Sequence, residues 1–118
     1  MPVPTEIRLD RATRQLHVSF DDGTQFALPA EYLRVESPSA EVQGHGPDQR
    51  KIIAGRRHVG IIAIETVGNY AVRLTFDDLH DTGIYSWDYL HELGLQQDRR
   101  WAVYLDALAS RGWSRDPK

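Results

Sequence analysis

Alternation of apolar and polar positions predicts strands in the first quarter of the chain. Apolar residues occupy every second position of Leu16–Phe20, which is the period of a half-buried strand. The next residues, 21–24, contain Asp-Gly, a dipeptide that favours a hairpin when it lies between two apolar runs. We therefore expect two or three strands within residues 5–28. A short helix should follow from Pro29 to about Arg34, because proline is well tolerated at the first helical position.

A second alternating region predicts a hairpin in the middle of the chain. Residues 61–67 and 70–76 are rich in apolar and β-branched side chains, and Gly68-Asn69 separates them. Glycine supplies the positive φ that a type II′ turn requires at its first central position. Between the two strand regions, residues 35–58 are rich in turn-forming residues and predict a long loop. Loops of this length in compact domains are typically functional or disordered.

The last third of the chain predicts a turn, a short strand and two helices. The turn is expected over residues 77–82 and the strand over 83–85, followed by a helix that Ser86 caps and Gly94 ends. A final helix should begin near Asp98, with a buried stripe of Trp101, Tyr104, Leu105 and Leu108. Trp113 is expected to cover the core from outside that helix. Together these elements predict an α+β fold: a mostly antiparallel sheet of about five to six strands, one short helix after the first strands, and two main helices near the C-terminus.

Composition narrows the classes of protein that the chain can represent. The 118 residues suit one domain, 1–118, and 41% of them are apolar, which is enough for a hydrophobic core. The net charge of −3 argues against a general nucleic-acid binder. The chain has no cysteine, so disulfides and thiolate chemistry are excluded. It also has no apolar run long enough for a membrane span. We expect a soluble cytoplasmic protein, with neither nucleic acid nor a membrane as its partner.

A dense polar and aromatic motif near the end of the predicted sheet carries a family resemblance. His80 is followed by Gly83-Ile84-Tyr85-Ser86-Trp87 and Tyr89-Leu90, while Glu31-Tyr32-Leu33-Arg34 and residues 67–72 precede it in the same order. This pattern resembles the small N-terminal domain of gamma-butyrobetaine hydroxylases, which also occurs as a free-standing domain of unknown function. In that family the domain is found alone, attached to oxygenases, and attached to ATPases of the iron–sulfur cluster carrier type. The resemblance thus implies a module that docks to a protein partner, in oxygenase or iron–sulfur cofactor metabolism.

The resemblance also implies a zinc site, and here the chain departs from the family. Hydroxylase members hold a structural zinc with three cysteines and one histidine. The matching positions in this chain are Ser37, Ser39, Val42 and His80. Structural zinc needs four good ligands, so we expect a degenerate site, with the zinc lost and no cofactor. A second departure is Leu79, where the family usually has glycine. Leucine disfavours positive φ, so the geometry of this turn is open.

The oxygenase reaction itself is not expected of this chain. Such enzymes bind iron through His-x-Asp or His-x-Glu and a distant histidine. The residues two positions after the five histidines are Ser19, Pro47, Gly60, Thr82 and Leu93. The chain also lacks a nucleophile motif and a phosphate-binding glycine loop. We expect a non-catalytic protein, and not a 2-oxoglutarate oxygenase by itself.

Two interpretations of the His80 region remain open. In the first, His80 and the neighbouring carboxylates Asp77, Asp78 and Asp81 bind a metal ion or exchange protons. In the second, the aspartates bond their own backbone in a turn and His80 is packed. Arg34 is expected to pair with an aspartate of the motif, or to bind an anion. Tyr85 and Trp87 either join the core or form part of a recognition face. The function favoured by these observations is a binding or accessory module whose contact surface is the His80 turn with the loop at 35–58. The alternative is a metal-binding protein.

Overall fold

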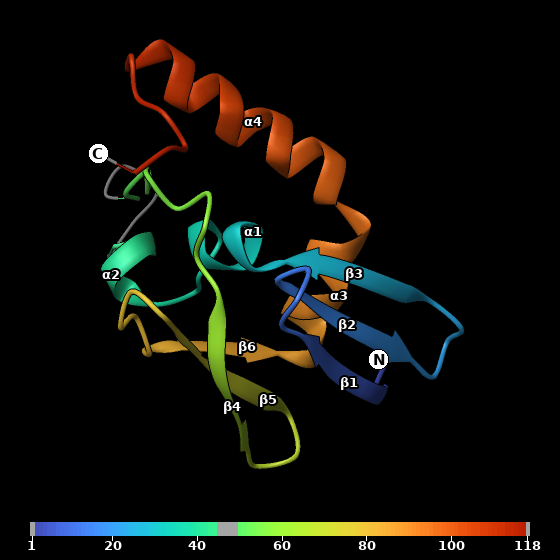
Figure 1. The fold of residues 1–118 in the computed structure, drawn as a ribbon. Coiled ribbons are helices and arrows are strands. Elements are labelled where there is room, and N and C mark those ends of the chain that lie inside the picture. Colours follow the sequence, from blue (N-terminus) through green and yellow to red (C-terminus); the bar gives the residue numbers. More distant parts are fainter. Residues whose placement is uncertain (1, 45–49, 118) are drawn as a thin grey trace.

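The computed structural model describes residues 2–44 and 50–117, and it shows an α+β domain with two antiparallel sheets of three strands each (Figure 1). The predicted α+β class, antiparallel pairing and number of strands are therefore confirmed, and the six strands form two sheets where one was expected. Of the predicted loop at 35–58, residues 45–49 lie outside the described residues.

The first sheet contains β1 (Pro4–Asp10), β2 (Gln15–Phe20) and β3 (Gln25–Pro29), in that order. Its register places Leu16 opposite Leu28 and Val18 opposite Phe26, so the apolar side chains share one face. The predicted Asp-Gly turn joins β2 to β3. The side chain of Asp22 accepts a hydrogen bond from the Thr24 N–H at 2.9 Å, and Gly23 has a φ of +87°.

The second sheet contains β4 (Ile61–Val67), β5 (Ala71–Phe76) and β6 (Gly83–Ser86), in that order. The β4–β5 turn has the predicted Gly68 with a φ of +55°. However, β5 begins at Ala71 and not at Tyr70, because Val67 pairs with Ala71. Tyr70 is left 56% exposed at the tip of the hairpin.

Two short helices follow the first sheet. Helix α1 (Ala30–Val35) continues directly from β3, as predicted, and all six of its residues are buried. Helix α2 (Ala40–Gln43) lies inside the predicted loop, and the hydroxyl of Ser39 caps it by accepting the Glu41 N–H at 3.2 Å. The loop is therefore partly helical.

The two C-terminal helices are α3 (Trp87–Leu95) and α4 (Gln97–Ser110). Ser86 caps α3 as predicted, by accepting the Tyr89 N–H at 3.1 Å. The prediction that Gly94 ends α3 is wrong, because the helix continues to Leu95. Gly94 serves packing instead: a Cβ at this position would lie 2.4 Å from the ring of Phe26 on β3.

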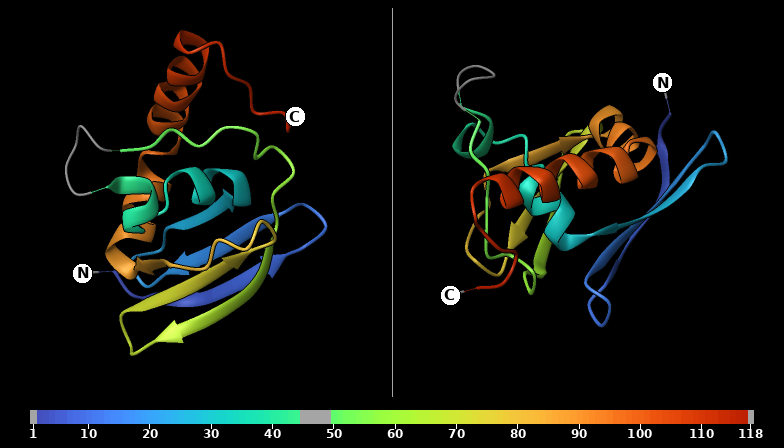
Figure 2. Two further views of the ribbon diagram at one scale, coloured as in Figure 1. Left: turned by 90° about the vertical axis from the view of Figure 1, so that its left-hand side faces the viewer. Right: turned by 90° about the horizontal axis from the view of Figure 1, so that it is seen from above.

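The predicted stripe of α4 is only partly buried. Tyr104 and Leu108 are buried and Trp101 is half-buried, but Leu105 is 39% exposed. Trp113 is 49% exposed, so it does not cover the core. Helix α4 extends away from the sheets, and the chain after it runs back past the segment before β4 (Figure 2). There the Gly55 N–H donates to the Ser114 carbonyl at 3.0 Å and the Arg57 N–H to the Arg115 carbonyl at 2.9 Å.

The main core lies between the sheets and is covered by α1 and α3. Its buried members come from every strand except β1, which contributes the half-buried Ile7 and Leu9. A smaller cluster of Val35, Tyr104 and Leu108 joins α4 to α1. This arrangement brings α2, the end of α1 and the β5–β6 turn to one side of the molecule (Figure 1).

Candidate functional site

The β5–β6 turn is a tight hairpin loop with an unusual residue at its third position. The Leu79 N–H donates to the Phe76 carbonyl at 3.0 Å, and the Phe76 N–H donates to the His80 carbonyl at 2.9 Å. In such three-residue loops the third residue takes the left-handed conformation, which glycine adopts most easily. Here that residue is Leu79, with a φ of +71°. Its side chain is 81% exposed.

Asp78 anchors this turn to two other segments. Its Oδ2 accepts hydrogen bonds from the Nε atoms of Arg34 at 2.8 Å and Arg56 at 2.7 Å. Its Oδ1 accepts the His80 N–H at 3.2 Å. Burial alone would raise the pKa of Asp78, but the hydrogen bonds from Arg34, His80 and Arg56 outweigh it and hold that pKa below its usual value. The predicted Arg34–aspartate pair is thus present, and Asp78 is the aspartate.

His80 is buried and makes hydrogen bonds through both ring nitrogens. Its Nε2 lies 2.9 Å from the Ser37 Oγ, and its Nδ1 lies 3.1 Å from the Glu41 Oε2. The neutral tautomer that satisfies both partners donates Nδ1–H to Glu41 and accepts the Ser37 hydroxyl proton at Nε2. Burial, together with the charge of Arg34, lowers the pKa of His80, although Glu41 and Asp78 act in the opposite direction.

A second hydroxyl pair closes the same corner of the molecule. The Ser39 Oγ lies 2.7 Å from the Thr82 Oγ1, and the Ser39 N–H donates to the Ser37 Oγ at 3.3 Å. Ser37 is fully buried. We call this set of Ser37, Ser39, Glu41, His80 and Thr82 the serine–histidine corner. It joins the start of α2 to the beginning of β6 through side-chain hydrogen bonds alone.

The order of Glu41, His80 and Ser37 is that of a catalytic triad, but the serine has no access to a substrate. The accessible surface of Ser37 is 0%. Its Oγ would lie only 2.6 Å from a Cβ added at Gly83, so the backbone of β6 packs directly against it. A nucleophile must reach the carbon that it attacks. The geometry therefore supports a structural role for this hydroxyl.

The residues at the zinc-matched positions converge but do not fit the ion. Ser37, Ser39 and His80 come together, and the side chain of Val42 is buried beside them with 1% exposure. Structural zinc is bound by thiolate, imidazole and carboxylate groups in a closed tetrahedron. This set offers one imidazole, two hydroxyls and an aliphatic side chain. Within residues 2–44 and 50–117, no cluster of three or more histidines, aspartates and glutamates has the arrangement of a metal site.

The two aromatic candidates occupy different environments. Tyr85 is completely buried, and its hydroxyl donates to the Leu33 carbonyl at 2.5 Å. Burial raises the pKa of this phenol far above its usual value. Trp87 is half-buried, and its Nε1–H donates to the Asn69 carbonyl at 2.7 Å in the β4–β5 turn. Tyr85 therefore binds the backbone of α1, while Trp87 binds the backbone of the β4–β5 turn.

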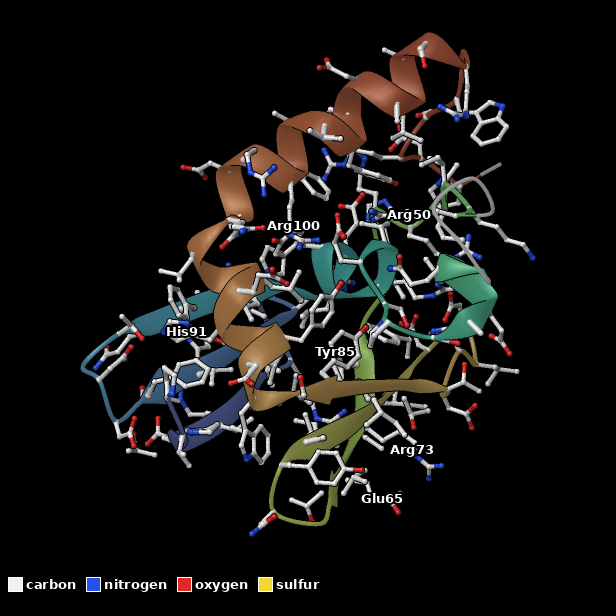
Figure 3. The ribbon with its side chains drawn as sticks, turned by 180° about the vertical axis from the view of Figure 1, so that it is seen from behind. Arg50, Glu65, Arg73, Tyr85, His91 and Arg100 are labelled. Carbon is white, nitrogen blue, oxygen red and sulfur yellow. The ribbon has the colours of Figure 1, made fainter. Side chains whose placement is uncertain are left out.

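Sequence reasoning missed a second buried charge cluster. Glu36, at the end of α1, is 3% exposed, and its Oε2 accepts hydrogen bonds from Arg50 at 2.8 Å and Arg100 at 3.1 Å. These two arginines come from different segments and lie on the same side of the molecule (Figure 3). Their positions in the sequence carry no periodic signal, because only the packing of α4 beside α1 brings them together.

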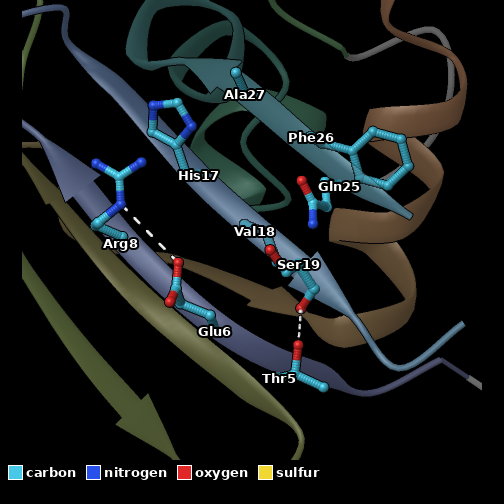
Figure 4. Close-up of a pocket in the computed structure, with 9 residues that line it drawn as sticks. All are labelled: Thr5, Glu6, Arg8, His17, Val18, Ser19, Gln25, Phe26 and Ala27. Carbon is cyan, nitrogen blue, oxygen red and sulfur yellow. Dashed lines mark hydrogen bonds and ion pairs between the residues drawn. The ribbon is translucent and has the colours of Figure 1, made fainter. Parts of the chain in front are cut away.

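Another groove lies on the outer face of the first sheet (Figure 4). It has a volume of about 620 Å³ and is open and largely polar. Arg8 and Glu6 form a pair at 4.0 Å across its floor, and the Thr5 hydroxyl donates to the Ser19 carbonyl at 3.3 Å. None of the predicted site residues lines it.

No helix in the described part of the chain has the length and apolar character needed to span a membrane.

Comparison with known proteins identifies the class of domain. Residues 7–91 match the family model described as gamma-butyrobetaine hydroxylase-like, N-terminal, and the chain belongs to that family. A search of curated proteins finds no match.

Three solved structures share the fold. Two NMR solution structures are 48% and 50% identical, with TM-scores of 0.86 and 0.85; they cover 100% and 99% of this chain and 93% and 87% of their own. A crystal structure of a protein of unknown function from Acidithiobacillus ferrooxidans, of the DUF971 family, is 40% identical with a TM-score of 0.66. It covers 77% of this chain and 91% of its own. The chain is thus similar to free-standing domains of unknown function.

Proposed function

We propose that this domain is a non-catalytic binding module that docks onto a protein partner through Leu79 and the turn that carries it. One observation carries the proposal: an apolar side chain, 81% exposed, is held at a φ of +71°. A left-handed conformation costs an L-residue roughly 1–2 kcal/mol. Backbone strain of this kind persists where the surrounding structure fixes it, and it concentrates at functional sites.

The turn is fixed from three directions, which suits a preorganised contact. Arg34 and Arg56 hold Asp78, while Ser37 and Glu41 hold the ring of His80. A rigid anchor loses little conformational entropy on binding. Leu79 is therefore presented to solvent between two residues, Asp78 and His80, whose side chains are bonded to other segments. The exposed carboxylates of Asp77 and Asp81 flank it, like the polar rim that surrounds the apolar centre of a protein interface.

The serine–histidine corner supports this role by replacing a metal with hydrogen bonds. We propose that the domain keeps this corner closed without zinc, because the imidazole that would bind the ion is already bonded by Ser37 and Glu41. The expected result of a zinc titration, followed by NMR at His80, is no saturable shift at micromolar ion. Saturable binding at the corner would instead favour the alternative, a metal-binding protein.

We further propose a class of partner protein. The family resemblance implies partners in oxygenase or iron–sulfur cofactor metabolism, since the domain also occurs attached to such proteins. The conformational argument for Leu79 holds for any protein surface with an apolar pocket.

Site-specific photo-crosslinking in living cells tests the docking role. A benzoylphenylalanine at position 79 should give a dominant crosslinked protein. The same group at position 70 is the matched control, because Tyr70 is also well exposed, at 56%, but lies at the tip of the β4–β5 hairpin. A crosslinking pattern that is the same at both positions would show that the turn is ordinary surface.

A further inference from the structure

A cleft between α4 and the segment before β4 is lined by arginine side chains on one part and by apolar side chains, the apolar wall, on the other. It has a volume of about 390 Å³, a size suited to a few side chains of a ligand. The polar part of its lining consists of Glu36, Arg50, Arg99 and Arg100, and the apolar part of Ile52, Val103, Tyr104 and Ala107. None of these residues belongs to the β5–β6 turn.

The charges of the cleft do not cancel. Glu36 lies at its floor, with a side chain only 4% exposed, and binds both Arg50 and Arg100. Arg100 also lies 3.2 Å from the carboxylate of Glu92. Arg99 is exposed, and among the described residues its guanidinium bonds only the Gln96 side chain, at 2.8 Å. Among the described residues, three guanidinium groups therefore face two carboxylates, and arginine stays charged at every physiological pH.

The arginines are also held in place before any ligand arrives. Gln96 Oε1 accepts hydrogen bonds from both Arg99 and Arg100, at 2.8 and 2.9 Å. The Arg100 guanidinium lies 5.8 Å from the centre of the Tyr89 ring. A planar guanidinium in a fixed position suits two-point recognition of a carboxylate.

The apolar wall favours an anionic ligand that also carries aliphatic groups. Val103 lines the cleft, is 61% exposed, and lies one helical turn from Arg99 in α4, so the two side chains share a stripe. A phosphate or a nucleic-acid backbone would leave this wall unused, and the chain as a whole carries a net charge of −3. A polypeptide segment with carboxylates beside aliphatic side chains matches both parts of the lining.

We infer that this cleft binds an acidic, aliphatic segment of the partner protein. The inference rests on the proposed docking function and adds the chemistry of the second contact. Arg99 and Val103 supply the ligand-specific part, because Arg50 and Arg100 are already committed to Glu36.

Selection from a random peptide library displayed on phage tests the inference without knowledge of the partner. Purified domain is expected to enrich peptides that combine Asp or Glu with Leu, Ile or Val. A fluorescein-labelled copy of the strongest peptide is then titrated against variants. Reversal of one cation at the contact, Arg99→Glu, should weaken binding about tenfold or more, and added salt should weaken the wild-type complex.

The matched control is Arg8→Glu, an equally drastic reversal at an exposed arginine on the first sheet, which should change the affinity less than twofold. Neither arginine bonds a buried group, so both variants should keep the melting temperature of the wild type. Leu79→Asn should also leave peptide binding unchanged. The photo-crosslink at position 79 therefore fails or succeeds independently of the cleft.

Three results would overturn the inference. The first is enrichment of peptides without acidic residues. The second is an Arg99→Glu variant that binds the selected peptide as tightly as the wild type does. The third is tighter binding of an oligothymidine with the same dependence on Arg99, which would assign the cleft to nucleic acid.

Discussion

The two turns of the second sheet need the same backbone conformation and obtain it with different residues. In the β4–β5 turn, Gly68 has a φ of +55°, and in the β5–β6 turn, Leu79 has a φ of +71°. Glycine adopts this conformation freely, whereas leucine does so only under constraint. The two turns also differ in how they are held. Side chains from three other segments bond the leucine turn, whereas the glycine turn is held by Trp87, which donates hydrogen bonds to the carbonyls of Asn69 and Tyr70.

The largest effect should come from removing the constraint on the leucine turn. Arg34→Met is expected to destabilise the fold by about 3 kcal/mol, because it takes one partner from a mostly buried ion pair. Arg56 stays bonded to Asp78, which keeps the loss at the lower end of the range for such pairs. Chemical denaturation measures the change.

The matched control lies on the other hairpin. Arg73→Met breaks the pair that Arg73 forms with Glu65 at 2.7 Å (Figure 3). Both side chains are largely exposed, so the expected loss is below about 0.5 kcal/mol. Equal losses in the two variants would remove the contrast between the turns.

Adding a side chain to the glycine turn should have the next largest effect. Gly68→Ala is expected to cost about 1–2 kcal/mol, because an L-residue is strained at this φ. The new Cβ would also lie 3.1 Å from the Tyr70 ring, but that ring is exposed and can move. The midpoint of urea unfolding measures the loss. No loss would mean that the turn readily adopts another conformation.

Replacing the strained leucine should raise the stability of the domain, in contrast to the changes above. Leu79→Gly is expected to stabilise the domain by up to about 1 kcal/mol, since relief of strain exceeds the extra entropy of glycine in the unfolded chain. Little burial is lost, because the side chain is 81% exposed. A thermal melt gives the sign. A clear destabilisation would show that Leu79 packs against its own domain.

The smallest effect is a pH dependence from His80. Its pKa is lowered in the folded state from the ordinary 6.5, so the folded domain binds this proton less readily than the unfolded chain does. Stability should therefore fall as the pH drops below about 6.5, and the fall should end once the pH is below the folded pKa. The lowered pKa of Asp78 acts separately, below its ordinary 3.8.

A variant isolates the contribution of His80. Melting temperatures between pH 7.5 and 5 should depend less on pH for His80→Gln than for the wild type. Identical slopes for the two proteins would assign the effect to other groups.

The sequence predicts much of this fold because its strong signals are local. Alternation, the two glycine turns and the Ser86 cap each depend on a few neighbouring residues. The alternation and the cap are confirmed, and both turns lie where they were predicted, but Tyr70 belongs to the second turn and does not begin β5. The errors arise where packing decides. Gly94 has the position of a helix end but serves the close approach of Phe26, and Leu105 has the helical spacing of a core residue but is 39% exposed.

The contacts of the candidate site also fall into two groups, those that the sequence predicted and those that it did not. Sequence analysis predicted that Arg34 pairs with an aspartate of the motif, and the structure identifies that aspartate as Asp78; the expected contact surface also joined the His80 turn to the loop after α1. Both are present in the structure. The cluster around Glu36 was not predicted, because its arginines at positions 50 and 100 are joined only by the tertiary fold.

The most direct test of the account is the affinity of the crosslinked partner for the purified domain. Calorimetry with wild type, Leu79→Asn and the control Tyr70→Asn separates the strained leucine from ordinary exposed surface. Asparagine tolerates positive φ, so the turn should keep its shape and its melting temperature. Burial of one leucine contributes about 1.5–3 kcal/mol, so Leu79→Asn should weaken binding about tenfold to a hundredfold while Tyr70→Asn binds normally. Unchanged affinity of Leu79→Asn would contradict the claim that this turn is the docking surface.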